Sequence, residues 1–485
     1  MTIETPEVAR GLQRQFLYAF LRRVFAHLHP GERFAHAPHV EAMCFALQEV
    51  AEGRERRLLI TLPPRYLKTI CASVALPAWL LGRNPGLKIL VASYGHDLAA
   101  KPARDFRSIV KAEFYQSLFP RMRIDDQRNT ALETETTSRG ARKAVSVGGS
   151  VTGFGADFII VDDAMKAGDA HSETERQRVR EYYEQVLYSR LNDKANGAII
   201  VVQQRLHEDD LPGYLMGTQK FRHLNLSAIA EGNERIPLLF GRQFVRRHGE
   251  ALWPAQEPLA VLEGIRTDMG SPTFSAQYQQ KPVYGEGNLL RIEWFGSYEA
   301  RIPREQFQYV VQSWDTAMTA EPTSDFTVCT TWGFRNSHWY LLEVLRRRLE
   351  YPDIKRSIRS QHQRWQPELI LIEDAATGTP LFQELSREGM HMLVPCRPDI
   401  GKEARVIAQS AKLEAGLVLI PETAEWREDF LHEVRAFPSG RYDDQVDSMT
   451  LFLWWTSCHG GLFWQTRMQN GGRPRGYTPR NWRPH

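Results

Sequence analysis

The chain has 485 residues, enough for about three domains of ordinary size. Hydrophobic residues make up 42% and charged residues 25% of it, so the composition argues against wholesale disorder, a collagen-like fibre and a long coiled coil. The net charge of +3 comes from 61 basic and 58 acidic residues, a balance that by itself indicates no nucleic-acid partner.

The sequence also predicts a cellular compartment. The apolar runs are all shorter than the roughly 18 residues of a membrane span, and the N-terminal segment lacks the apolar core of a signal peptide. The five cysteines are widely separated, so we expect neither a disulfide framework nor a structural zinc site, as in a reducing cytosol. We therefore expect a cytoplasmic protein without membrane contact.

The first part of the chain, 1–230, alternates short apolar runs with helical patterns. Four runs have the character of buried strands, and helices are expected between them. Strands that alternate with helices are typical of an α/β domain with a mostly parallel sheet covered on both faces. The four predicted strands are 57–62, 87–93, 158–161 and 198–202.

The remaining chain contains a second regular block. An irregular stretch rich in Pro, Gly, Trp and Tyr, 231–305, is expected to connect the two blocks. The second block, 306–460, opens with three apolar runs in an antiparallel meander, and a helical crossover leads to a fourth strand, 369–372, that should run parallel to a neighbour. The sheet of this block is therefore mixed. Residues 461–485 carry five Arg and no acidic residue, which predicts a flexible basic tail.

A phosphate-binding loop is predicted between the first strand and the helix that follows it. The segment 62–69 has the sequence LPPRYLKT. In a phosphate loop, backbone N–H groups surround the phosphates, a Lys reaches the β and γ oxygens, and a Ser or Thr hydroxyl holds Mg²⁺. Lys68 and Thr69 supply these side chains, although Leu62 and Leu67 stand where glycines are usual. The alternative is a Pro-rich turn with a surface lysine.

Two acidic residues at the end of a later strand favour the nucleotide site. Asp162 and Asp163 directly follow the apolar run 158–161. An ATPase needs one carboxylate beside Mg²⁺ and a second to activate water. We assign Asp162 to the metal and Asp163 to the water, with Glu173 or Glu175 as alternatives for the second role. A helix N-cap is the structural alternative for the aspartates.

Polar residues near these strands extend the predicted site. Gln204 and Arg205 follow the run 198–202, at a strand end where polar groups could sense the γ-phosphate. Arg139 and Arg142 lie just before the acidic strand, and either could be an arginine finger that stabilises the transferred charge. The alternative is that these arginines are merely solvated.

A second acidic site is predicted in the C-terminal block. Asp315 ends its first strand, Glu373 ends its fourth strand, and Asp443 and Asp444 open a late helix. If the first and fourth strands are parallel neighbours, Asp315 and Glu373 end at the same edge, and Asp443 or Asp444 closes the cluster. Converging carboxylates repel each other unless a cation joins them, and one or two Mg²⁺ or Mn²⁺ ions there would support phosphodiester hydrolysis. Asp325 could add a ligand, and a non-catalytic α/β domain is the alternative.

Seven segments in this order make the sequence similar to the large terminase subunit of tailed bacteriophages. This resemblance extends from about residue 30 to 455 and implies a P-loop ATPase domain that drives viral DNA into a procapsid. It also implies an RNase H-like nuclease domain that cuts concatemeric DNA. The segments are 62–69 (LPPRYLKT), 89–98 (ILVASYGHDL), 148–163 (GGSVTGFGADFIIVDD), 205–210 (RLHEDD), 274–282 (FSAQYQQKP), 313–317 (SWDTA) and 442–447 (YDDQVD).

The resemblance further implies cofactors, partners and residue roles. The cofactors are ATP and Mg²⁺, with Mg²⁺ or Mn²⁺ at the nuclease site. The partners are double-stranded viral DNA, a portal protein, a small terminase subunit and further copies in a ring on the procapsid, in the cytoplasm of the infected bacterium. A helicase or repair translocase and a non-enzymatic assembly protein are the competing interpretations. The residues that match the family's functional positions are Arg65, Lys68, Thr69 and Asp162 in the ATPase, and Asp315, Glu373 and Asp444, or Asp443 in its place, in the nuclease.

The chain departs from the family pattern at three positions. Family members usually have Gly where Leu67 stands, Thr where Gln204 stands and Glu where Asp163 stands. None of these differences removes a charged group that the mechanism needs.

Overall fold

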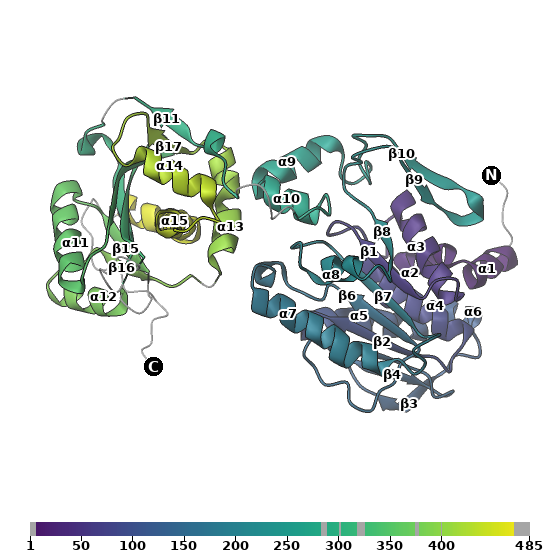
Figure 1. Ribbon diagram of the computed structural model, residues 1–485. Coiled ribbons are helices and arrows are strands. Elements are labelled where there is room, and N and C mark those ends of the chain that lie inside the picture. The colour runs from purple at the N-terminus through teal and green to yellow at the C-terminus, as the bar shows by residue number, and fades with distance from the viewer. Residues whose placement is uncertain are drawn as a thin grey trace. The chain divides into compact units, whose positions relative to one another are not determined.

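The chain folds into two compact units (Figure 1). The first unit is Met1–Arg266 with Thr273–Tyr284, and the second is Thr267–Pro272 with Gly285–His485. The predicted connecting region, 231–305, is thus divided between the two units. The computed structural model describes residues 6–282, 289–299, 302–317, 325–373, 378–398 and 400–469.

An eight-stranded sheet forms the centre of the first unit. Its strand order is β3-β4-β5-β2-β6-β7-β1-β8, and the strands from β5 to β8 in this order run parallel, while β3 and β4 are antiparallel at one edge. The four predicted strands are its central members, which confirms the mostly parallel sheet. The strands are β1 (Arg57–Thr61), β2 (Lys88–Ser93), β3 (Ile124–Asn129), β4 (Glu133–Thr136), β5 (Ala141–Ser146), β6 (Phe158–Asp162), β7 (Ala198–Gln203) and β8 (Arg222–Asn225).

The central strands are buried on both faces, which explains their continuous apolar sequences. On β1, Leu58 and Ile60 belong to one hydrophobic cluster and Leu59 to the other. On β7, Ile200 belongs to the first of these clusters and Ile199 to the second. Because successive side chains point to opposite faces, a run of apolar residues fits a strand only when both faces are covered.

Helices supply that cover on each face of the sheet. The first cluster contains residues of α2 to α6, and the second contains residues of α7 and α8. The helices of this region are α1 (Pro6–Gln15), α2 (Leu17–Leu28), α3 (Pro38–Ala51), η1 (Ile70–Ala75), α4 (Leu76–Arg83), α5 (His96–Lys111), α6 (Glu113–Leu118), η2 (Ala167–Asp169), α7 (Glu173–Glu181), η3 (Tyr182–Leu187), η4 (Tyr188–Arg190) and α8 (Leu211–Gly217).

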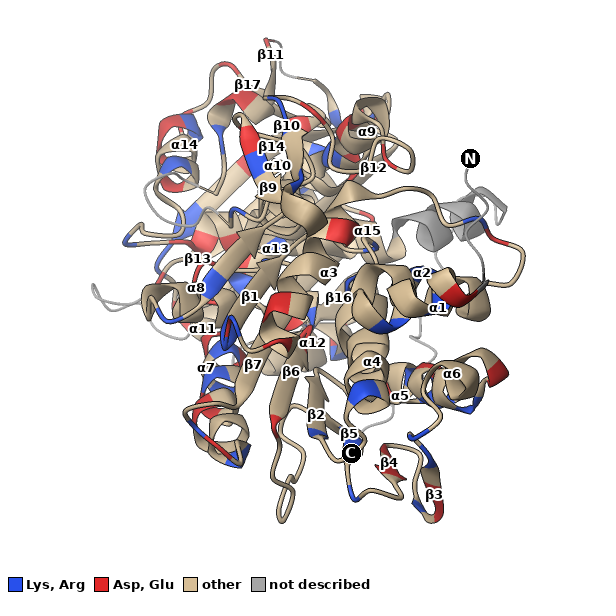
Figure 2. Ribbon diagram, turned by 90° about the vertical axis from the view of Figure 1, so that its right-hand side faces the viewer, with Lys and Arg blue, Asp and Glu red and all other residues tan. Residues whose placement is uncertain are grey.

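The rest of this unit is less regular and more polar. The strands β9 (Glu234–Pro237) and β10 (Gln243–Arg246) form an antiparallel hairpin around η5 (Leu239–Gly241), and α9 (Leu259–Met269) and α10 (Ser271–Gln277) follow. Figure 2 shows both signs of charge on α7 and on the edge strands β3 and β4, whereas β2 and β6 are largely uncharged. Charge is thus kept to the periphery, apart from the strand ends described below.

A mixed seven-stranded sheet forms the centre of the second unit. Its order is β11-β17-β14-β13-β12-β15-β16. As predicted, β12, β13 and β14 form an antiparallel meander, and β15 lies parallel to β12. The strands are β11 (Gly296–Tyr298), β12 (Tyr309–Asp315), β13 (Thr327–Arg335), β14 (His338–Arg347), β15 (Leu369–Glu373), β16 (Leu393–Cys396) and β17 (Val418–Pro421).

Helices lie on both faces of this second sheet (Figure 1). On one face, α11 and α12 pack against Trp314 and Ile370, and on the other, α15 contacts β12 and β13 and is joined by α13. The helices are η6 (Ile292–Trp294), η7 (Arg304–Gln306), α11 (Tyr351–Trp365), α12 (Gly378–Arg387), α13 (Lys402–Glu414), α14 (Arg427–Ala436) and α15 (Asp444–Gln469). The last helix thus continues into the segment predicted as a basic tail, of which 470–485 lie outside the described residues.

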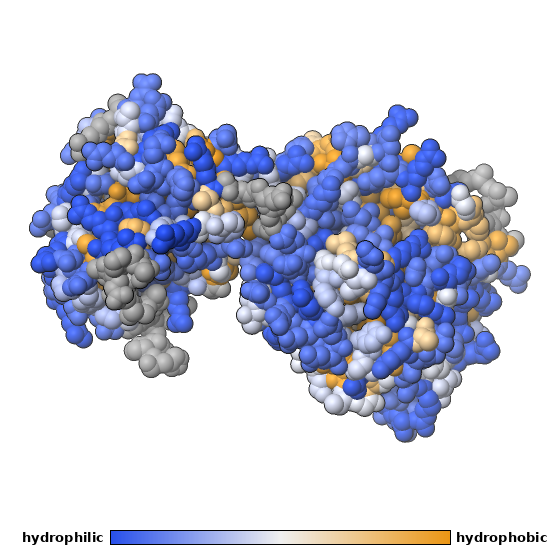
Figure 3. Space-filling model, viewed as in Figure 1, coloured by the Kyte–Doolittle hydropathy of each residue, from blue (hydrophilic) through white to orange (hydrophobic). Residues whose placement is uncertain are grey.

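The surfaces of both units are mostly hydrophilic on the face shown in Figure 3. This agrees with the burial of the apolar side chains in cores on either side of each sheet. Among the described residues, none of the helices has the length and apolar character needed to cross a membrane.

Candidate functional site

The predicted phosphate loop connects β1 to a helix that begins at Lys68. Arg65 and Leu67 have positive φ angles of 70° and 64°. This left-handed backbone costs an L-residue about 1–2 kcal/mol and is the reason that glycine is usual in such turns. The Leu67 side chain packs against the hydrophobic cluster on its side of the sheet. The loop therefore adopts its turn without the family's glycine, with apolar contact offsetting the backbone strain.

Replacing Leu67 by glycine is expected to leave the protein about 1 kcal/mol more stable than replacing it by alanine. Both changes remove the same side-chain contacts, but only alanine keeps a Cβ at a positive φ. Urea unfolding of the two variants measures the difference. Equal free energies of unfolding would contradict the strain at this position.

Five polar side chains meet at the end of this loop. Lys68 is 6% exposed, and its Nζ lies 2.8 Å from Oδ1 of Asp163. The Thr69 hydroxyl donates a hydrogen bond of 3.3 Å to Oδ1 of Asp162, and the Ser73 hydroxyl donates one of 2.6 Å to its Oδ2. The structure thus brings the predicted lysine, hydroxyl and two carboxylates together.

The electrostatics of Asp162 suit a metal ligand. The carboxyl is 3% exposed, and burial, followed by the adjacent charge of Asp163, raises its pKa to about 6. Hydrogen bonds from Ser73 and Thr69 and the charge of Lys68 oppose this shift. A divalent cation would remove the repulsion between the aspartates, and the hydroxyl and carboxylate oxygens are ligands that Mg²⁺ prefers.

The strand order places Gln204 at the same edge. Strand β7 lies between β1 and β6, with Gln203 paired to Thr61 and Val202 paired to Asp162. Gln204 follows directly, and its Oε1 is buried without a hydrogen-bond partner among the described residues. Buried polar atoms normally have a partner, so this amide is a candidate ligand contact.

Arg205 is engaged in a different interaction. Its guanidinium donates to both carboxylate oxygens of Asp210, at 2.9 and 3.1 Å, and to the carbonyl oxygens of His207 and Glu208. Asp210 in turn caps α8 by accepting a hydrogen bond from the Gly213 N–H. These buried groups stabilise the turn after β7.

The two arginines predicted as finger candidates lie elsewhere. Arg139 is exposed in the turn before β5, whereas the carboxyl end of β5, at Ser146, is level with Asp162 two strands away. The six residues of β5 separate Arg139 from that end by about 20 Å. The structure therefore does not bring Arg139 to the loop of its own chain, because the direction of β5 places it at the opposite edge.

Arg142 is buried rather than poised at the surface. It is 1% exposed, donates to the Ser73 carbonyl oxygen at 3.1 Å, and lies over the Phe106 ring. Burial lowers its pKa to about 9, an effect that the charge of Asp162 opposes. Arg142 thus supports the helix after the loop.

The other predicted residues of this site lie at its margins. The side chain of Arg65 is exposed on the loop. Glu173 and Glu175 occupy the first turn of α7, where Glu175 pairs with Arg178 at 3.0 Å.

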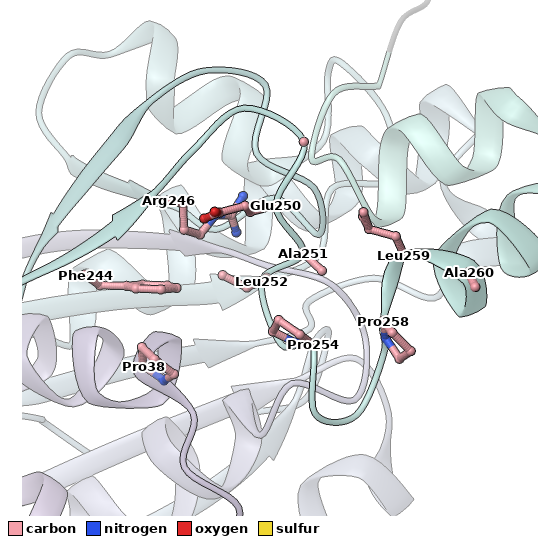
Figure 4. Close-up of a pocket in the computed structure, with 11 residues that line it drawn as sticks. Pro38, Phe244, Arg246, Glu250, Ala251, Leu252, Pro254, Pro258, Leu259 and Ala260 are labelled. Atoms are coloured by element: carbon pink, nitrogen blue, oxygen red, sulfur yellow. The ribbon is translucent and has the colours of Figure 1, made fainter.

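An apolar cavity of about 700 Å³ lies beside the chain segments that contact Tyr66 of the phosphate loop (Figure 4). The Tyr66 hydroxyl donates to Glu257 at 2.7 Å, and its ring contacts His39 and Trp253. These three partners are adjacent in sequence to cavity residues. The cavity lining includes Pro38, Phe244, Leu252, Pro254 and Pro258, with Arg246 and Glu250 side by side at one end.

The second predicted site forms at one edge of the second sheet. Trp314 and Ile372 are paired in parallel strands, so Asp315 and Glu373, the next residues, end at the same edge. Asp444 and Asp447 join them from the first turn of α15. The structure therefore brings the three predicted carboxylates together and adds a fourth.

The carboxylates repel each other strongly. Burial raises the pKa of Asp315 well above its ordinary value, and the charges of Asp447, Glu373 and Asp444 raise it further, against a lowering effect of Lys402. Burial also raises the pKa values of Asp444 and Asp447 to about 6 each. Asp444 accepts a hydrogen bond of 3.4 Å from the Phe326 N–H.

Two basic residues of α13 hold part of this cluster. Arg405, 2% exposed, donates to Glu373 at 3.0 Å and to Asp447 at 2.9 Å. Lys402 pairs with Asp443 at 3.0 Å and with Asp447. Asp443 is thus engaged by a lysine, whereas the charge of Asp444 contributes to the raised pKa of Asp315.

Sequence reasoning missed three members of this site. Asp447 lies one turn after Asp444, so its i, i+3 spacing on the helix was a usable signal. Lys402 and Arg405 are also three residues apart, but they lie about forty residues before the aspartates. The polar sequence of their helix gives no sign that it packs against the site. The carboxylate oxygens near Asp315, only some of which are paired with basic side chains, are of the kind that bind divalent ions such as Mg²⁺ or Mn²⁺.

A strand-end carboxylate cluster on a mixed sheet with helices on both faces defines a candidate nuclease of the RNase H-like class. Residues 312–454 match the model of the terminase RNaseH-like domain family, which confirms the resemblance to large terminases for this part of the chain. None of the curated proteins compared with the chain matches it.

Solved structures of phage terminases also align with the chain. The large terminase of a thermophilic bacteriophage, in complex with ATP-gamma-S, is 11% identical, with 84% of this chain and 97% of that chain covered and a TM-score of 0.47. The large terminase of bacteriophage HK97 is 12% identical, covering 91% and 99%, with a TM-score of 0.37. The magnesium-bound nuclease of thermophilic phage G20c is 15% identical, covering 35% and 98%, with a TM-score of 0.29.

Proposed function

We propose that the protein is the large subunit of a phage terminase, with an ATPase in the first unit and a metal-dependent endonuclease in the second. The observation that carries the proposal is the presence of both sites in one chain. A lysine and two aspartates meet behind a phosphate loop, and a carboxylate cluster lies in a domain of the terminase RNaseH-like family. The first site alone would fit many kinds of ATPase. The domain that holds the second site is the part that resembles terminases.

In the proposed ATPase, the loop backbone and Lys68 bind the β- and γ-phosphates of ATP, and Thr69 and Asp162 hold Mg²⁺. Asp163 accepts a proton from a water whose oxygen attacks the γ-phosphorus, and the bond to the ADP oxygen breaks. Gln204, whose buried amide has an unpaired oxygen among the described residues, would contact the terminal phosphate or the attacking water. Because Gln204 directly follows β7, a shift of its side chain on hydrolysis would move the chain segment after this strand.

The arginine roles divide by position. Arg65, exposed on the loop, would add positive charge beside the phosphates. Arg139 lies at the far edge of its own sheet, so as a finger it would have to act on the site of another copy.

In the proposed nuclease, Asp315, Glu373 and Asp444 hold divalent metal, with Asp443 the less suitable alternative because Lys402 engages it. A bound ion would lower the pKa of water and stabilise the leaving oxygen of the phosphodiester. Arg405 fixes the Glu373 carboxylate on its outer side. These three carboxylates lie near one edge of the sheet, where a bound ion would draw their oxygens together beside a DNA phosphate.

This function defines the partners that we propose. The substrate is concatemeric double-stranded viral DNA, which the ATPase unit moves through contacts to the sequence-independent backbone. The motor would be a ring of copies on the portal of a procapsid, with a small subunit that selects the DNA, in the cytoplasm of the infected bacterium.

Separate loss of the two activities tests the proposal. We expect the purified protein to hydrolyse ATP and to cleave plasmid DNA with Mg²⁺ or Mn²⁺. Lys68→Ala should lower ATP hydrolysis by about 100-fold or more, because it removes the buried ammonium that faces the phosphates, and should leave cleavage intact. ATP hydrolysis without any cleavage would instead indicate a helicase or translocase, and absence of nucleotide binding would indicate an assembly protein.

A further inference from the structure

Three arginines lie beside the carboxylate cluster of the second unit. Asp315 on β12 is paired with Val328 on β13, which is paired with Arg346 on β14. Residues directly opposite in antiparallel strands share a face, so Arg346 lies on the same face as Asp315. Arg348 follows two residues later, and Arg441 approaches from the loop before α15.

Two aromatic rings hold these guanidinium groups. The Arg346 and Arg348 guanidinium carbons each lie 3.9 Å from the centroid of the Phe326 ring. The guanidinium carbon of Arg441 lies 5.1 Å from the centroid of the Tyr442 ring, and the Phe326 and Tyr442 rings meet edge to face at 5.2 Å. Stacking orients a guanidinium by its face and leaves the N–H groups at its edge for hydrogen bonds.

The same rings connect the arginines to the predicted metal ligands. The backbone N–H of Phe326 donates to Asp444, and Tyr442 precedes that aspartate by two residues. Arg346 is partly neutralised by Glu433 at 3.6 Å, and Arg348 donates to the Tyr442 hydroxyl at 3.2 Å. The cluster thus presents positive charge directly beside carboxylates that would repel DNA.

We propose that Arg346, Arg348 and Arg441 bind a backbone phosphate of DNA next to the one that is cut, and so position the scissile phosphate among the carboxylates. This inference rests on the proposed nuclease function. Planar guanidinium groups suit phosphate oxygens because they can donate two parallel hydrogen bonds, and such contacts fix the position of a duplex without reading its sequence. The exposed Arg441 and the half-buried Arg348 would make the main contacts.

The experiment compares DNA cleavage by the full-length protein and by the double variant Arg348→Gln/Arg441→Gln, with Mn²⁺ present. We expect the variant to lose about 10-fold or more in kcat/KM, mainly through a higher KM, while its Mn²⁺ affinity measured by calorimetry stays that of the wild type. The slope of log(kcat/KM) against log[salt] should fall in magnitude by about one per lost phosphate contact.

The matched control is Arg347→Gln, because Arg347 lies between these residues on the opposite face of β14. It should cleave like the wild type. Arg441→Gln alone guards against misfolding, since Arg441 is exposed, and should show part of the KM increase. Wild-type KM and salt slope in both variants would overturn the inference, as would an equal loss in Arg347→Gln. If the wild type itself cleaves no DNA, the proposed nuclease function fails instead.

Discussion

Replacing Arg405 by methionine is expected to destabilise the second unit by about 3–5 kcal/mol. Arg405 is 2% exposed and donates to Glu373 and to Asp447, itself 2% exposed. Without the guanidinium, the buried Asp447 and the half-buried Glu373 keep their negative charges beside Asp315 with less positive charge to offset them. Removing one partner of a buried ion pair costs far more than the intact pair contributes, because the remaining charge is left desolvated.

Calorimetric unfolding in EDTA measures this loss as a shift of one transition by about 2–4 °C per kcal/mol. Arg359→Met is the matched control, because Arg359 pairs with Glu388 on the surface. This substitution should lower the free energy of unfolding by less than about 1 kcal/mol. Adding Asp447→Asn to Arg405→Met should restore part of the stability, because it removes one of the stranded charges. Similar small losses for the two arginines would refute the buried role of Arg405.

Asp315→Asn is expected to abolish metal-dependent cleavage and yet to stabilise the metal-free protein above pH 6. The variant loses a central ligand, so cleavage should fall by about 1000-fold or more, with ATP hydrolysis unchanged. At the same time it removes a carboxylate whose pKa is raised well above its ordinary value by burial and by three neighbouring carboxylates.

The sign of the pH effect follows from that raised pKa. The folded protein binds the proton more tightly than the unfolded chain, so the stabilisation is complete below the ordinary pKa of 3.8 and is lost as the pH rises. Asp444 and Asp447, with pKa values of about 6, act in the same direction. The wild type in EDTA should therefore lose stability between pH 4 and pH 8, and Asp315→Asn should lose less.

Melting temperatures across this pH range, with EDTA and with Mn²⁺, check the prediction. Mn²⁺ should raise the melting temperature of the wild type at pH 8 and have much less effect on the variant. Asp353→Asn, on the exposed start of α11, serves as the control and should follow the wild type. A stability difference between wild type and Asp315→Asn that is the same at every pH would show that the carboxylates are not crowded.

Most of the fold and most residues of both candidate sites can be predicted from the sequence, because the central strands are apolar and the candidate site residues directly follow them. Apolar runs identify the central strands, and the carboxyl ends of parallel strands meet at one edge, which is why Asp162 lies near Lys68 and Asp315 near Glu373. The edge strand β3 has the polar sequence IDDQRN and escapes this reasoning. Its register comes from pairing with β4, which no local pattern reveals.

Two arginines lie where their positions in the sequence do not suggest. Arg139 is close to Asp162 in sequence. However, only the carboxyl end of the intervening strand β5 lies level with Asp162, so Arg139, which precedes β5, lies at the opposite end of the strand. Arg405 is distant from every carboxylate in sequence, yet α13 packs against α15 and delivers it between two of them. Distance along the chain is a poor guide wherever helices and strand order decide which ends meet.

In the ATPase that we propose, the ion pair between Lys68 and Asp163 would keep the empty nucleotide site inactive. The lysine that would grip the nucleotide and the acid that would deprotonate water neutralise each other across 2.8 Å until a polyanion competes for the lysine. A bound triphosphate would attract the ammonium group of Lys68 and so free Asp163 to act as the base only when substrate is present. The contact that neutralises the buried Lys68 would thus also limit hydrolysis by a site without bound nucleotide.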